Sequence, residues 1–305
     1  MTEMQNPIVH NLKRAKQLLT APFNSGPGMS LSCKLFGNSA GFQQNVYGGL
    51  ELFNARRKKT APDDGAPTEL VETIRRDGVA VAPWRYDRAL METIRTRIDA
   101  AINEGADRAF TDSKGSVVQR LVDDPLKSVP EIKELATPEL MSTLHSYFRS
   151  RVRFYYPDCW RNYPITEDEP MKHSVYANRW HNDSGKTSIL SLFVLVADTS
   201  PQHGPMLAVN RDLTRESIRK GFRHRYAYGE AEPMLEDPKN HIMCSGEAGT
   251  AFFVNTRVAL HRAGIPANGL FRDMVSLHFA SIPGDEDVWD DTKAPEGKTL
   301  EWHRF

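Results

Sequence analysis

Cysteine is scarce in this 305-residue sequence, and long apolar runs are absent. The three cysteines, Cys33, Cys159 and Cys244, include no C-x-x-C pair, which argues against a disulfide framework and for a reducing compartment. Residues 1–23 contain no uninterrupted apolar segment followed by a small-residue cleavage site, so we expect no secretory signal. The longest strongly apolar run is about nine residues, whereas a helix needs about 20 to span a bilayer. We therefore expect a cytoplasmic protein with no membrane partner.

The chain also has no excess of either charge. Lys and Arg total 39, and so do Asp and Glu, so no overall field favours nucleic acid or an anionic membrane. The basic cluster at 56–59 holds only four charges, which is too few for a nucleic-acid site. Hydrophobic residues at 40% and charged residues at 26% are typical of globular proteins. The expected partner is a small-molecule substrate.

Gly185-Lys186-Thr187 suggests a phosphate-binding loop, but its context does not fit one. A P-loop requires a glycine five positions before Gly185, and that position is Trp180. The loop should also lead into a helix, whereas residues 189–196 are apolar and rich in β-branched side chains, which is typical of a buried strand. We therefore exclude the P-loop.

The order of elements predicts an α+β, mainly β fold. Residues 1–67 are expected to form an N-terminal extension and linker, and residues 68–305 one domain. Helical periodicity predicts helices over 69–76, 87–103 and 131–150, with a strand at 79–82 after Asp77-Gly78. From about residue 150, strands are predicted at 151–156, 173–181, 188–197, 205–209, 250–255 and 272–281. Helices followed by a run of strands indicate a β core with helices packed outside it.

His181-Asn182-Asp183 lies at the end of one predicted strand. Side chains i and i+2 of a strand share a face, so His181 and Asp183 would point the same way. They would supply two members of the 2-His-1-carboxylate triad that holds Fe(II) and leaves coordination positions open. The third ligand must come from elsewhere, because a lone H-x-D occurs often by chance.

The C-terminal third supplies that ligand and a cation. His261 follows the predicted strand 250–255 after a turn, and Arg272 opens the strand 272–281. In this last strand the odd positions 273–279 are mostly apolar and the even positions 272–278 are mostly polar, which is typical of a barrel with a working cavity. An arginine binds a carboxylate through two parallel hydrogen bonds, so Arg272 can hold the far end of a metal-chelating dicarboxylate.

With these residues, the sequence resembles the phytanoyl-CoA dioxygenase family of Fe(II)/2-oxoglutarate-dependent oxygenases. The H-x-D, His261 and Arg272 match the family's H-x-D…H…R pattern, and Trp180 and the stretch 203–206 also fit. The resemblance covers about residues 68–282. It implies a double-stranded β-helix (jelly-roll, cupin-like) core with flanking helices, with Fe(II), 2-oxoglutarate and O2 as cofactor and cosubstrates. It further implies oxidation of a substrate C–H bond with release of succinate and CO2.

The resemblance assigns roles to single residues. His181, Asp183 and His261 become the metal ligands and catalytic residues, and Arg272 the 2-oxoglutarate anchor. Tyr176 and Asn178 precede the first ligand and could hydrogen-bond this cosubstrate. Halogenating relatives replace the carboxylate ligand with a small residue, so Asp183 favours hydroxylation or a related oxidation. The segment 207–212 departs from the Pro-Gly-Ser-His turn that the family often has.

Two other functions fit parts of the pattern. A cupin-type isomerase or hydrolase would bind Zn²⁺ or Mn²⁺ through the same three ligands without needing Arg272, and a non-catalytic jelly roll would keep the ligands alone. The arginine-rich segment 211–225 is interpreted as a solvated helix face, with an anionic substrate as the functional alternative. His278 could face the cavity, but packing is the favoured interpretation. The residues do not select a substrate.

Overall fold

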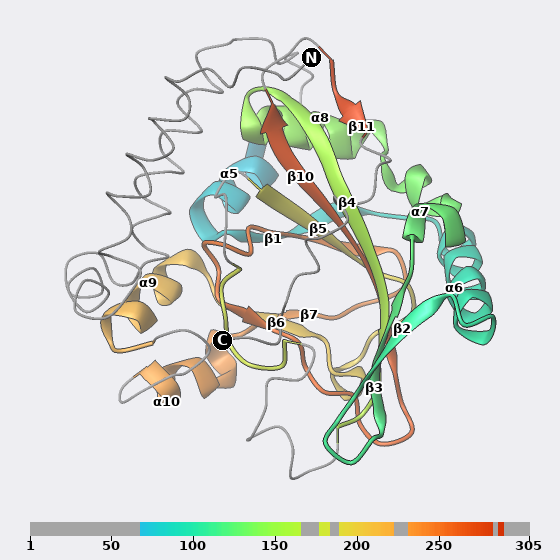
Figure 1. Ribbon diagram of the computed structural model, residues 1–305. Helices are drawn as coiled ribbons and strands as arrows, with labels where there is room; N and C mark the ends of the chain where they lie inside the picture. The colour runs from blue at the N-terminus through green and yellow to red at the C-terminus, as the bar shows by residue number, and fades with distance from the viewer. Residues whose placement is uncertain (1–67, 166–176, 184–188, 223–230, 283–285, 290–305) are drawn as a thin grey trace, which may run out of the picture.

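The computed structural model describes residues 68–165, 177–183, 189–222, 231–282 and 286–289 (Figure 1). The predicted extension 1–67, Tyr176 and the GKT stretch lie outside the described residues. The division of the chain at residue 68 therefore stays a prediction. No helix in the described ranges has both the length and the apolar character needed to cross a membrane.

The first described elements agree with the sequence prediction. They are α5 (Thr68–Asp77), β1 (Val79–Arg85) and α6 (Arg88–Asn103). Helix α6 begins where Asp87 accepts a 2.8 Å hydrogen bond from the backbone N–H of Ala89. Its buried residues recur at helical spacing and join the main hydrophobic core; they are Met91, Ile94, Ile98 and Ala101. Gly78 links α5 to β1 with a φ of 77°, a conformation that favours glycine.

The helix predicted over 131–150 is divided in two. The 3-10 helix η3 (Pro130–Leu135) is separated from α8 (Pro138–Phe148) by a break at Ala136 and Thr137. Proline disfavours helical geometry in the residue before it, so Thr137 is extended and caps α8 instead. The hairpin of β2 (Asp107–Thr111) and β3 (Val117–Val122) and the short α7 (Pro125–Ser128) were not predicted.

One large sheet and one small sheet form the β part of the molecule. The large sheet has the order β1-β8-β5-β10-β4-β3-β2 and is antiparallel along this path, and β11 pairs with β4 in parallel. Its remaining strands are β4 (Arg151–Asn162), β5 (Ile189–Leu195), β8 (Thr250–Val254), β10 (Arg272–Ile282) and β11 (Val288–Trp289). The small sheet, in the order β7-β6-β9, contains β6 (Met206–Ala208), β7 (Ile242–Cys244) and β9 (His261–Arg262). The other elements are η4 (Pro201–His203), α9 (Arg211–Arg219), α10 (Ala231–Glu236) and η5 (Pro238–Asn240).

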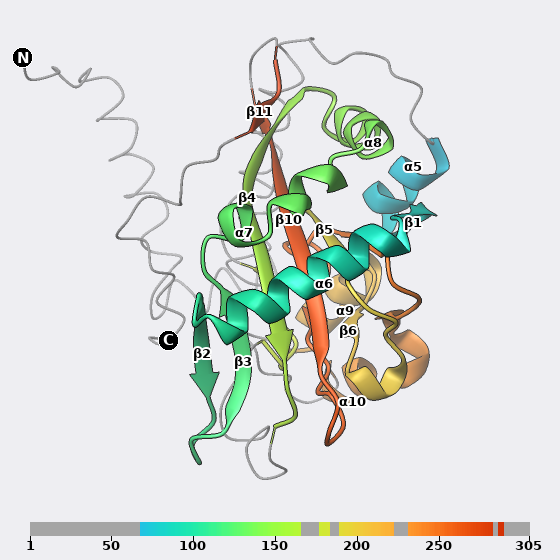
Figure 2. The same cartoon turned by 90° about the vertical axis from the view of Figure 1, so that its right-hand side faces the viewer.

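Strand β10 separates two packed layers, as its alternation predicted. Val275, Leu277 and Phe279 pack with residues of α6 and α8, and Figure 2 shows α6 lying across this face of the sheet. Met274 packs on the opposite side in a cluster that includes Met206 and other residues of the small sheet. The even positions therefore face the space between the two sheets. These mostly antiparallel sheets confirm the mainly β prediction, whereas the double-stranded β-helix connectivity stays a prediction.

A buried ion pair joins the helical layer to the large sheet. The guanidinium of Arg161 on β4 donates two hydrogen bonds to Asp273 on β10, of 2.6 and 2.7 Å, and the two carboxylate oxygens share them. Arg161 also contacts Asp99 of α6 at 2.7 Å and lies 4.1 Å from the ring centre of Phe271. Residues 161 and 273 are register partners, so this pair fixes how the two central strands align.

Removing one member of this pair should destabilise the fold. In Asp273→Asn, Arg161 keeps the partly exposed Asp99 as its one acidic partner among the described residues. We expect a loss of about 3 kcal/mol in the free energy of unfolding. Denaturation by urea measures this loss. The exposed pair of Arg108 with Asp123 provides the control, because Asp123→Asn should cost about 0.5 kcal/mol or less. Equal, small losses in both variants would contradict a structural role for the buried pair.

Candidate metal centre

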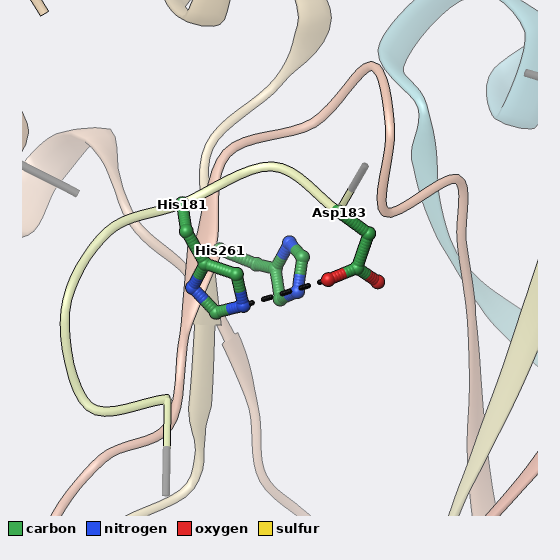
Figure 3. Close-up of side chains that lie close together, drawn as sticks. All are labelled: His181, Asp183 and His261. Atoms are coloured by element: carbon green, nitrogen blue, oxygen red, sulfur yellow. Dashed lines mark ion pairs between the residues drawn. The ribbon is translucent and has the colours of Figure 1, made fainter. Parts of the chain in front are cut away.

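His181, Asp183 and His261 converge, as the sequence predicted. One possible ligand atom from each residue lies within 4.8 Å of the others, and the three side chains point toward a common space (Figure 3). The Nε2 atom of His181 lies 3.7 Å from Oδ1 of Asp183, and the two imidazole ring centres are 4.3 Å apart. Both histidines are buried, and Asp183 is partly exposed. Within the described ranges, these residues form the one group of three or more candidate ligands that meets this distance criterion.

The backbone reason for this convergence differs from the predicted one. In the described part of the predicted strand 173–181, residues 177–181, only His181 has strand-like pairing, through an isolated antiparallel bridge to His261. The two residues exchange backbone hydrogen bonds of 3.0 Å each way. Asp183 is held separately, because its N–H donates to the carbonyl of Thr256 at 3.0 Å. The prediction of a continuous strand ending at His181 is therefore wrong for residues 177–180, and pairing with the segment 256–261 replaces the i, i+2 argument.

Backbone carbonyls fix which ring nitrogen of each histidine is available. Nδ1 of His181 donates to the carbonyl of Arg179 at 2.8 Å, and Nδ1 of His261 to that of Ala259 at 3.2 Å. A carbonyl only accepts, so each Nδ1 carries a proton, and Nε2 is the ring nitrogen that can bind a metal. Both Nε2 atoms are thus prepared to bind a metal, and second-sphere hydrogen bonds of this kind orient metal-bound imidazoles in proteins.

Asp183 is suited to be the anionic ligand. Burial acts to raise the pKa of this carboxyl, but the neighbouring His261 and His181 act to lower it. The hydroxyl of Thr256 and the charge of Arg257 act in the same direction, and the resulting pKa lies below the ordinary value for aspartate. The carboxylate is therefore ionised at neutral pH. Two imidazoles and one carboxylate fit the donor set of a 2-His-1-carboxylate metal site.

A contact outside the triad ties both histidine segments to α10. The indole N–H of Trp180 donates to Oε1 of Glu236 at 2.9 Å, and Arg262 contacts the two oxygens of the same carboxylate at 3.2 and 3.1 Å. The guanidinium of Arg262 also lies 4.9 Å from the ring centre of Trp180. Trp180 and Arg262 are the immediate neighbours of His181 and His261. Glu236 therefore holds together the two chain segments that carry the imidazoles.

Arg272 is buried between the two sheets. It is 3% exposed and begins β10, where its register partner on β4 is Asn162. Burial raises the pKa of the Cys244 thiol on β7 to about 12, and the positive charge of Arg272 opposes that rise. The guanidinium is thus close enough to the small sheet to act on Cys244. The role of Arg272 as the residue that holds 2-oxoglutarate stays a prediction.

The other candidate residues have different outcomes. Asn178 is buried on the segment that leads to His181, whereas Tyr176 lies outside the described residues. His278 hydrogen-bonds the hydroxyls of Ser191 and Ser276 at 2.8 and 2.9 Å, which agrees with the packing interpretation. Cofactor contacts of Asn178 and Tyr176 remain predictions.

Of the basic segment 211–225, residues 211–219 form α9, whereas residues 223–225 lie outside the described residues. The basic residues of α9 have acidic neighbours on the same helix. Lys220 pairs with Glu216 at 2.9 Å and Arg215 with Asp212 at 3.6 Å. These i, i+4 and i, i+3 pairs fit a solvated helix face. An anionic substrate remains a prediction.

The sequence did not predict the residues that position the candidate ligands by contacting them or their chain neighbours. Thr256 and Glu236 have no motif or spacing that distinguishes them in the sequence. Thr256 is recognised only because its backbone and hydroxyl both contact Asp183. Trp180 was noted as the residue before the first ligand, but its bond to Glu236 depends on the tertiary position of α10.

No protein-family model matches the sequence, and no curated protein matches it. Several solved structures match its fold. The non-heme α-ketoglutarate (2-oxoglutarate) dependent epimerase SnoN from nogalamycin biosynthesis superposes with a TM-score of 0.52 at 16% identity, over 70% of this chain and 82% of that one. The carbocyclase SnoK from the same biosynthesis gives 0.51 at 16% identity, over 73% and 88%. EctD from S. alaskensis, solved with 2-oxoglutarate and 5-hydroxyectoine, gives 0.54 at 15% identity, over 74% and 81%. The chain therefore shares the fold of non-heme 2-oxoglutarate-dependent enzymes.

Proposed function

We propose that this protein is an Fe(II)- and 2-oxoglutarate-dependent oxygenase of the phytanoyl-CoA dioxygenase type. It hydroxylates, or otherwise oxidises, an unactivated C–H bond of a small molecule and releases succinate and CO2. The observation that carries this proposal is the convergence of His181, Asp183 and His261 in a fold that also buries Arg272 between its sheets. Structures with this fold include an epimerase, a carbocyclase and a protein crystallised with a hydroxylated compound, so the fold is compatible with several oxidative outcomes.

Different residues bind the metal and the cosubstrate. His181 and His261 present their Nε2 atoms, and the ionised Asp183 contributes the negative charge of the ligand set. Arg272 holds the distal carboxylate of 2-oxoglutarate through two parallel N–H···O bonds. When they are bound, Fe(II) and 2-oxoglutarate together supply the activation of O2 and the oxidising power for the C–H bond.

Trp160, Phe193 and Met274 form part of an apolar cluster on the same side of the large sheet as Arg272. We propose Asn178 and Tyr176 as further hydrogen-bonding residues for the cosubstrate, and a cytoplasmic location for the protein.

Removing the carboxylate ligand should abolish metal binding without unfolding the protein. We expect Asp183→Ala to lower the affinity for Fe(II) by more than about 100-fold, because the ligand set loses its only charge and one of its three members. Competition with a chromophoric chelator under anaerobic conditions measures this affinity, and circular dichroism checks the fold. Asp212→Ala on the exposed face of α9 is the control and should bind iron as the parent does. Unchanged iron affinity in Asp183→Ala would refute the assignment.

Arg272 distinguishes the oxygenase from a cupin-type metal enzyme. Arg272→Ala should weaken binding of 2-oxoglutarate by about 100-fold, because a buried carboxylate loses its cationic partner, while metal affinity stays the same. Arg272→Lys keeps the charge but cannot form two parallel hydrogen bonds. Its affinity for 2-oxoglutarate should therefore lie between those of the parent and Arg272→Ala. Calorimetry measures 2-oxoglutarate binding to the Co(II)-loaded variants and Co(II) binding to the metal-free variants. Arg219→Ala on α9 serves as a surface-charge control. A cupin-type isomerase or hydrolase would show no dependence of ligand binding on Arg272.

A further inference from the structure

The backbone bridge between His181 and His261 has an outer side, which faces away from the imidazoles. Trp180 directly precedes His181, and Arg262 directly follows His261, so these two residues lie opposite each other across the antiparallel bridge. Neighbouring side chains of an extended segment point to opposite sides, which places Trp180 and Arg262 on the outer side. Their contact agrees with this placement, because the Arg262 guanidinium lies 4.9 Å from the ring centre of Trp180.

Glu236 at the end of α10 binds both of these outer side chains. Its Oε1 accepts the indole N–H of Trp180 at 2.9 Å and an Nη1 hydrogen of Arg262 at 3.2 Å. Its Oε2 lies 3.1 Å from Nη2 of the same guanidinium. Hydrogen bonds to a carboxylate are stronger than those between neutral groups. One carboxylate therefore connects a donor from each of the two segments that carry a candidate imidazole ligand.

Apolar packing joins α10 to the same two segments. Ala231 and Leu235 of α10 are fully buried. They belong to one hydrophobic cluster with Trp180 and Leu260, the residues that directly precede the two histidines. The ring of His241, which lies 5.2 Å from the Trp180 ring, also contacts the carbonyl of Leu235 through Nε2 at 2.7 Å. Helix α10 is thus part of the packing unit that surrounds the outer side of the bridge.

Contacts of this kind affect metal binding although they lie outside the ligand set. Ligands that are already held in place lose less conformational entropy when a metal binds, so the metal binds more tightly. Removing an outer contact of a metal ligand typically weakens metal binding by about 10–100-fold. The bonds of Glu236 act on the chain neighbours of His181 and His261, and their loss would allow the two imidazoles to move apart.

We propose that Glu236 is a positioning residue of the metal centre and that it couples α10 to metal binding. This inference rests on the metal-binding part of the proposed function, and it does not depend on the identity of the cosubstrate. Glu236 acts through Trp180 and Arg262 rather than as a ligand. Coupling between two sites is reciprocal, so a metal held by the histidines in turn stabilises the packed position of α10.

The first test measures Co(II) binding to the full chain by calorimetry. In Glu236→Ala we expect the Kd for Co(II) to rise by about 10-fold or more, and the visible absorption spectrum of the Co(II)-saturated protein to change. Glu236→Gln keeps an acceptor oxygen but loses the charge that binds Arg262, so its Kd should lie between those of the parent and Glu236→Ala. The matched control is Glu131→Ala, because Glu131 accepts a 3.1 Å bond from Arg97 in the helical layer. This control should keep the Kd and the spectrum of the parent.

The second test follows hydrogen exchange of the backbone amides of residues 231–236, with and without saturating Co(II). In the parent and in Glu131→Ala, we expect Co(II) to slow this exchange, because the metal stabilises the packed position of α10. In Glu236→Ala the effect of Co(II) should be lost. A purely structural Glu236 would give faster exchange in Glu236→Ala but leave the effect of Co(II) intact.

Two results would overturn the inference. If Glu236→Ala lowers Tm but leaves the Kd and the spectrum for Co(II) unchanged, the carboxylate only stabilises the fold. If Glu131→Ala weakens Co(II) binding as much as Glu236→Ala does, the effect comes from lost stability and not from position. A parent protein that does not bind Co(II) would overturn the proposed function together with this inference. A parent that binds Co(II) but not 2-oxoglutarate would overturn the oxygenase assignment alone.

Discussion

The candidate site depends on one backbone pairing, the antiparallel bridge between His181 and His261. These residues are far apart in the sequence, and each donates its N–H to the carbonyl of the other at 3.0 Å. The bridge places the two imidazoles beside each other, and the Thr256 carbonyl then positions Asp183 against them. Glu236 reinforces the arrangement by contacting the neighbours of both histidines. Without this pairing, the three ligands would belong to unrelated loops.

The side chains of β10 alternate between the helical face and the interior face of the large sheet, so one strand contributes to both layers. Asp273 faces the helices and locks β10 to β4 through Arg161, so it determines the register of the central strands. The same register places Arg272 beside Asn162 on the interior face. The ion pair on the helical face therefore also determines which side chains of β4 and β10 lie next to each other on the interior face. A one-residue slip between the strands would reverse both faces and separate this pair.

The sequence predicted features that local chemistry determines. The apolar periodicity of α6 and the alternation in β10 are visible in single segments, and both are confirmed. The spacing of His181, Asp183 and His261 predicted a group of candidate metal ligands, and the structure brings these three residues together. Their role as ligands stays a prediction. The prediction of one helix over 131–150 is wrong at Thr137 and Pro138. Proline disfavours helical geometry in the residue before it, and this effect outweighs the apolar periodicity of the segment.

Other features require the tertiary structure. The predicted strand before His181 is wrong for the described residues because pairing with His261, not local propensity, organises that segment. Glu236 and Thr256 act through groups distant in sequence, and no spacing rule finds them. Satisfaction of hydrogen bonds is a property of the packed chain, so it could not be predicted from residue order.

The most direct test of the account is anaerobic addition of Fe(II) and 2-oxoglutarate to the purified protein, followed by visible absorption spectroscopy. If the protein is a 2-oxoglutarate-dependent oxygenase, a metal-to-ligand charge-transfer band appears only with both additions and is lost in His261→Ala. Iron binding without the band would show that 2-oxoglutarate does not chelate the metal, and it would contradict the oxygenase assignment in favour of a cupin-type metal protein.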